Sequence, residues 1–160
     1  NAINDPSTDE YFKAVFQTGK LVPHHDDNKI LSITDSLLSN NQEKDFFYFV
    51  VFTKSLNGAD GFYSEAAGAR ATEFITNKTE WFADYFNIGP TLTENDMRNW
   101  ASSILGEIQV GREDEEAKAI DELETKLMKN IKFGRKEYCV VIKKIIGYIR
   151  EIEKERITNH

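Results

Sequence analysis

The side chains of this sequence that could carry chemistry are few, and one short segment concentrates them. The run His24-His25-Asp26-Asp27 holds imidazole and carboxylate groups, the ligands that Zn²⁺ and other divalent ions accept in proteins. Adjacent residues of one loop rarely all face the same ion, and Asp26 or Asp27 is also a suitable N-cap for a following helix. We therefore predict a loop that leads into a helix, and a chain with no metal and no cofactor.

Two carboxylates would suit a small hydrolase. Glu65 and Glu73 lie among small and apolar residues, and a glycosidase needs two carboxyl groups roughly 5–10 Å apart across a cleft. On one helix these two positions are about two turns apart, which is too far for a catalytic pair by themselves. A small hydrolase that uses Glu65, Glu73 or the acidic and histidine residues of segment 24–27 remains the alternative function.

Other catalytic signatures are absent from the sequence. It has no glycine-rich phosphate loop, no Gly-x-Ser-x-Gly, no His-Glu-x-x-His and no di-iron Glu-x-x-His motif. Cys139 is the single cysteine, so an internal disulfide and a multi-cysteine metal site are excluded. It follows Tyr138 and precedes two valines, which favours a buried, inert thiol. The sequence thus predicts no catalytic residue and favours a protein that is not an enzyme.

Length and composition indicate one globular domain over residues 1–160. The chain is 40% hydrophobic and 29% charged, which is typical of a soluble folded protein rather than a disordered one. Its net charge of −7 argues against nucleic acid as the partner, because nucleic-acid binders present a basic face. No apolar run approaches the roughly 18 residues of a membrane span. The polar start at residues 1–4, without methionine, is what removal of an export signal or trimming of the chain would leave, and we expect an exported or periplasmic protein.

Helical periodicity dominates the chain, with Ser, Thr, Asp, Gly and Pro at the boundaries. We predict about eight helices and no strand. Their predicted starts are the Ser7–Glu10 capping box, Asp26 or Asp27, the segment 46–52, the end of the loop 57–61, Thr79, Thr93, Glu113 and Arg135. The expected fold is all-α, either an antiparallel helical bundle or a short stack of αα-hairpins.

The heptamer Phe46–Phe52 is ambiguous by itself. Its β propensity favours a strand, but Asn40 with Glu43 imitates a capping box and residues 56–58 resemble a helix C-terminus. We predict a helix that is buried nearly all round. The run Ala66-Ala67-Gly68-Ala69 removes side-chain bulk from the next helix, which we expect to pack closely against the Phe-rich one.

Charge is segregated near the C-terminal end of the sequence. Residues 107–124 carry eight acidic residues against two basic ones, and residues 126–156 carry ten basic residues against four acidic ones. The favoured interpretation is two neighbouring helices with complementary, solvated faces, supported by i,i+4 pairs Asp114–Lys118 and Glu122–Lys126. The alternative is a steering surface for a charged partner.

Aromatic residues crowd one short predicted helix. Trp81, Phe82, Tyr85 and Phe86 fall within six positions, and a helix of that length has only one face to bury. Core packing is the ordinary role of such residues, but part of this surface is expected to stay open, and exposed aromatic patches often mark binding sites. We predict that these four residues are the contact surface and that Trp81 anchors a partner.

The predicted function is therefore a non-catalytic protein-interaction module. The partner is expected to be another protein with a basic or amphipathic surface, because the chain itself is acidic. A toxin-neutralising (immunity-type) role or that of an exported binding protein fits this profile of a small, acidic, helical chain without catalytic motifs.

Overall fold

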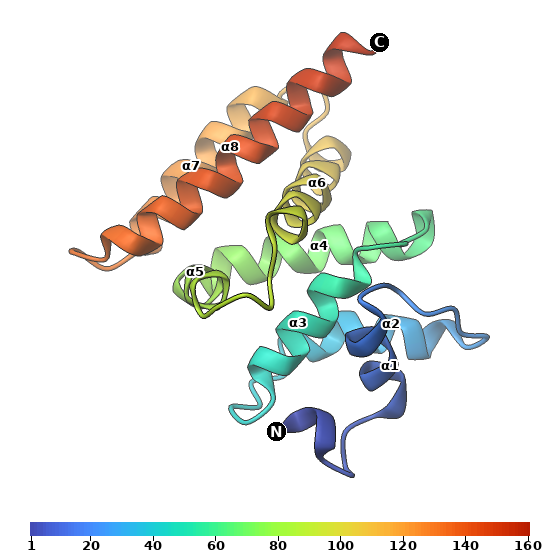
Figure 1. Cartoon of the computed structure of the whole chain (residues 1–160). Coiled ribbons are helices and arrows are strands. Elements are labelled where there is room, and N and C mark those ends of the chain that lie inside the picture. Colours follow the sequence, from blue (N-terminus) through green and yellow to red (C-terminus); the bar gives the residue numbers. More distant parts are fainter.

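The structure is a computed structural model that describes all 160 residues, and it confirms the all-α class (Figure 1). A 3-10 turn at Ala2–Asn4 precedes eight α-helices, and there is no strand. The helices are α1 (Glu10–Thr18), α2 (Asp27–Ser36), α3 (Asp45–Ser55), α4 (Gly61–Asn77), α5 (Thr79–Asn87), α6 (Glu94–Gly111), α7 (Glu116–Asn130) and α8 (Lys136–Thr158).

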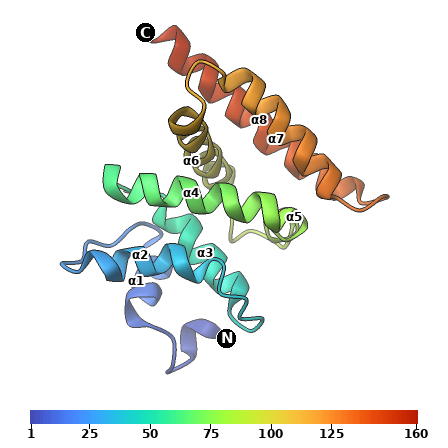
Figure 2. The same ribbon diagram turned by 180° about the vertical axis from the view of Figure 1, so that it is seen from behind.

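Helices α4 and α6 form the middle of the molecule, and the other helices flank them. Helix α6 packs on α4 and on α8, and α7 lies beside α8 as an antiparallel hairpin (Figures 1 and 2). On the other side α1 and α2 pack against α3, and α2 also contacts α4. One cluster of 33 buried hydrophobic residues includes members of all eight helices, so both flanks share a continuous core.

Local sequence signals place most helix starts correctly. The Asp9 and Asp26 side chains accept hydrogen bonds from the backbone N–H groups of the residues two positions later, which caps α1 and α2. The predicted Ser7–Glu10 capping box is a correction, because the Ser7 hydroxyl donates to Asp5 and the N-cap is Asp9. Thr93 and Asp96 form a complete capping box at α6. Thr79 is a correction, because its hydroxyl donates back to the carbonyl of Ile75 (2.6 Å) and Lys78 occupies the N-cap position of α5.

Segment 46–52 is helical, as predicted, but its start differs from the prediction. Helix α3 begins at Asp45 after Lys44, without a side-chain cap, and Asn40 has a left-handed backbone (φ 56°) rather than a capping role. Helix α7 begins later than predicted, because residues 112–115 form a turn in which Asp114 is left-handed (φ 67°). In this helix Ala119 is buried and Ala117 is exposed.

Helix α4 packs mainly on α6 rather than α3, with Gly68 of the small-residue run at the contact, which corrects the predicted neighbour. Gly68 is buried against α6, and a Cβ atom added to it would lie 2.9 Å from the backbone carbonyl oxygen of Ser103. Phe74 and Tyr63 still link α4 to α3, through a ring contact with Phe49 (5.3 Å between centroids) and a hydrogen bond to Ser55. The close approach of backbones is therefore made between α4 and α6.

Gly68→Ala is expected to lower the free energy of unfolding by about 1–3 kcal/mol. The added methyl group forces the two backbones apart, and this cost exceeds the roughly 1 kcal/mol that alanine contributes as a better helix former. Gly106→Ala is the matched control within α6, because no atom lies within 4 Å of a Cβ added there. Urea unfolding of the two variants measures the difference, and equal or increased stability of Gly68→Ala would contradict the close packing.

Candidate functional site

Helix α5 presents one large aromatic side chain to solvent. Trp81 is 56% exposed, whereas Phe82 is fully buried and Tyr85 is 7% exposed. Phe86 is half-buried and packs on Phe82, with 4.9 Å between ring centroids. The predicted contact surface is thus corrected for Phe82 and Tyr85, which are core residues, because the inward face of α5 meets α3 and α6.

A pocket of about 190 Å³ opens beside Trp81. It lies where the α2–α3 loop, the start of α3, the end of α4 and the first turns of α5 meet. The lining residues are Leu37, Asn40, Gln42, Asp45, Phe74, Lys78, Trp81 and Tyr85. Such a volume is small for a drug-sized ligand and is suited to one side chain of a partner.

Asp45 supplies a carboxylate oxygen without a partner. Its Oδ1 atom is buried and makes no hydrogen bond. Asp45 is the first residue of α3, at the end of the helix where the dipole interacts favourably with negative charge. A buried acceptor that lacks a donor is costly. Asp45 also lines the pocket, where its negative charge attracts a cationic group.

Lys78 adds a positive charge to the lining of the same pocket. Its Nζ donates to Asn40 Oδ1 (2.6 Å) and lies 5.9 Å from the centre of the Phe74 ring. An ammonium group has three donors, so two remain available for carbonyl oxygens after the bond to Asn40. The lining of the pocket therefore combines the carboxylate of Asp45 with free donors at Lys78.

Tyr85 contributes an uncharged aromatic ring to the lining of the pocket. Burial, together with the negative charges of Asp45 and Asp84, raises its pKa to about 12, so the phenol stays protonated. Its ring lies 5.7 Å from the Trp81 ring and 4.9 Å from the Phe49 ring, centre to centre. Trp81 and Tyr85 together offer the aromatic surfaces that attract cations.

The histidine segment is a loop, and its side chains are used locally. His24 Nδ1 accepts a hydrogen bond from the backbone N–H of Asp26 (2.9 Å), and the rings of His24 and His25 stack at 4.5 Å. Asp26 caps α2, as predicted. No three His, Cys, Asp or Glu side chains gather in an arrangement that could hold a metal ion.

Of the two carboxylates considered for hydrolysis, Glu73 shares Arg70 with Asp35, which lies 3.1 Å from that guanidinium, and Glu65 forms no ion pair. Glu65 and Glu73 are both exposed on α4, and Glu73 forms an ion pair with Arg70 (2.9 Å). Cys139 is a half-buried free thiol on α8.

The segregated charges meet across the α7–α8 hairpin. Arg150 of α8 binds Asp121 (2.8 Å) and Glu124 (2.6 Å) of α7, which agrees with complementary neighbouring faces. The predicted i,i+4 pairs Asp114–Lys118 and Glu122–Lys126 do not form. Asp114 precedes the helix, and Glu122 binds Arg112 instead.

Sequence reasoning missed Asp45, Lys78 and Asn40 as members of one pocket. Asp45 resembles any acidic residue in the first turn of a helix, and Lys78 lies between two helices. No local sequence pattern therefore marks either residue as part of a site. Comparison with protein-family models, with curated proteins and with solved structures finds no match to this chain.

Proposed function

We propose that this chain is a non-catalytic protein-interaction module that binds a basic side chain of its partner in the pocket beside Trp81. The observation that carries the proposal is a pocket lined by the Asp45 carboxylate next to an exposed tryptophan. Large exposed aromatic side chains next to a pocket are typical anchors of protein interfaces. A toxin-neutralising role, or another exported binding function, is one form of this activity.

The chemistry of the pocket favours an arginine or lysine side chain within a peptide. Its cationic end would lie near the Asp45 carboxylate, and its stem would lie against the exposed Trp81 ring, where cation–π attraction adds to apolar contact. Lys78 would repel a free cation, but its two remaining donors suit the backbone carbonyls of the same peptide. The net charge of −7 favours the approach of a basic partner.

The test is titration with short amphipathic peptides that contain arginine, and with matched peptides that contain glutamate instead. The chain has two tryptophans, so two indole N–H signals are expected in a nitrogen-15 NMR spectrum. The Trp81 signal should shift with the arginine peptides. The Trp100 signal should stay in place, because that ring is fully buried and its N–H binds Thr53.

Asp45→Asn and Trp81→Ala are each expected to weaken binding by about tenfold or more, because each removes one anchor of the cation. Phe62→Ala is the matched control, since Phe62 is 50% exposed and lies at the opposite end of α4 from the pocket. Equal binding of arginine and glutamate peptides, or wild-type affinity in both pocket variants, would overturn the proposal.

A further inference from the structure

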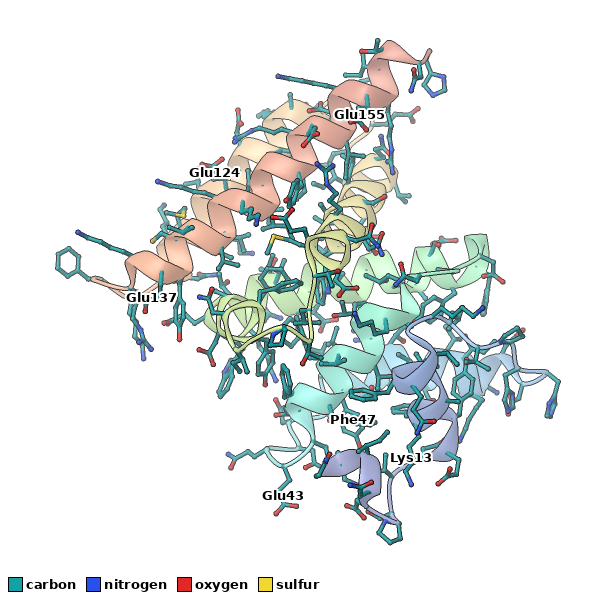
Figure 3. The ribbon with its side chains drawn as sticks, in the orientation of Figure 1. Lys13, Glu43, Phe47, Glu124, Glu137 and Glu155 are labelled. Carbon is teal, nitrogen blue, oxygen red and sulfur yellow. The ribbon has the colours of Figure 1, made fainter.

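The turn between α7 and α8 projects from the body of the molecule. Figures 1 and 2 show this orange end of the hairpin extending past α5 into solvent. In Figure 3, Glu137 lies beside this turn, and Glu155 lies toward the other end of α8. The turn comprises residues 131–135, of which Ile131 is buried and anchors it to the hydrophobic core.

Phe133 lies in this turn with its side chain entirely in solvent. It is 107% exposed, more than any other large hydrophobic residue of the chain. Gly134, which follows it, has a left-handed backbone (φ 89°), and this conformation shapes the turn. No structural role within the chain explains a phenyl ring at this position, because the ring touches neither the core nor another aromatic ring.

Five basic residues surround Phe133 in the sequence, with no acidic residue among them. They are Lys126, Lys129, Lys132, Arg135 and Lys136, all exposed. The four lysines form no ion pair, whereas Arg135 lies 3.7 Å from Glu137 and 3.9 Å from Glu80. At a rise of about 1.5 Å per residue, Lys129 lies within about 6 Å of the turn along the α7 axis.

The rest of the molecule carries the opposite charge. The net charge is −7, and residues 107–124, toward the far end of the hairpin, hold eight acidic residues. The hairpin is therefore basic at its turn and acidic at its other end. An anionic surface would attract the turn and repel the remainder, which sets a single orientation of approach.

We propose that the α7–α8 turn docks on the surface of an anionic phospholipid bilayer, with Phe133 inserted among the headgroups and the lysines bound to phosphates. The turn is convex and has one apolar side chain ringed by cations, which suits a planar and deformable surface. An acidic protein would have to offer a preformed pocket for that ring. The docking is peripheral, since no helix is both long and apolar enough to cross a membrane. The docking uses residues separate from the Trp81 pocket, so the result for one site does not depend on the result for the other.

The experiment is co-sedimentation of the whole chain with two kinds of vesicle, phosphatidylcholine alone and phosphatidylcholine mixed with phosphatidylglycerol. Binding is expected only to the mixed vesicles and should weaken as salt is raised. Phe133→Ser should reduce the partition coefficient by about tenfold, because the ring no longer leaves water. Lys132→Gln and Lys136→Gln should each reduce it by about fivefold.

Val110→Ser and Lys118→Gln are the matched controls, because both side chains are exposed and lie away from the turn. Both controls should bind mixed vesicles as the wild type does. Equal binding to the two kinds of vesicle, no binding to either, or an unchanged partition of Phe133→Ser would overturn the proposal. So would binding of soluble poly-glutamate that is as tight as vesicle binding and independent of Phe133, which would assign the turn to an acidic macromolecule.

Discussion

Trp100→Ala is expected to lower the free energy of unfolding by about 3–5 kcal/mol. Trp100 is fully buried in α6, where its ring stacks on Phe49 at 5.2 Å and meets Phe52 at 5.1 Å and Phe82 at 5.0 Å, centre to centre. Truncation would leave a large cavity where α3, α5 and α6 converge. It would also leave the buried hydroxyl of Thr53 without the indole N–H that donates to it at 2.8 Å.

Trp81→Ala is the variant whose stability is compared with that of Trp100→Ala. Trp81 is 56% exposed, so its loss should cost less than about 1 kcal/mol while it weakens partner binding. Trp100→Phe keeps a ring in the cavity, so its loss of free energy of unfolding should lie between the losses of the two alanine variants. Denaturant unfolding followed by circular dichroism measures all three variants. If Trp100→Ala were no less stable than Trp81→Ala, the placement of Trp100 in the core and Trp81 at the surface would be contradicted.

Asp96→Ala is expected to destabilise the chain by about 3–5 kcal/mol. The Asp96 carboxylate is 2% exposed and binds Lys54 Nζ at 2.6 Å, and the same group accepts the backbone N–H of Thr93 at 2.9 Å. The substitution therefore removes the capping box of α6 and leaves the Lys54 ammonium, which is 17% exposed, without its counter-charge in the contact between α3 and α6.

The double variant Lys54→Met/Asp96→Ala should be less destabilised than the sum of the two single variants. Removing both charges avoids an unpaired buried ion, although the hydrogen bond from the Thr93 backbone N–H to the Asp96 side chain is still lost. Glu151→Ala is the control, because its ion pair with Arg98 is 3.3 Å long and half exposed, and it should change stability by less than about 1 kcal/mol. Strict additivity in the double variant would show that Lys54 and Asp96 do not interact.

The sequence alone determined the elements of this protein, because the signals involved act within a few residues. Caps at Asp26 and Thr93 satisfy the free N–H groups of the turn that follows them, so these helix starts are predictable. Segment 46–52 was recognisable as a helix from its flanking turns despite its β propensity.

The tertiary structure alone decided which faces meet, because contact between helices depends on residues far apart in the chain. Helix α3 is apolar nearly all round, so no stripe on it could show which neighbour would cover it, and the small residues of α4 met α6 instead. The separation of Trp81 from Phe82 was settled by the direction in which α5 faces the core. The pocket beside Trp81 joins Asp45 to Lys78 only through the packing of α3 against its neighbours, and no local pattern encodes that meeting.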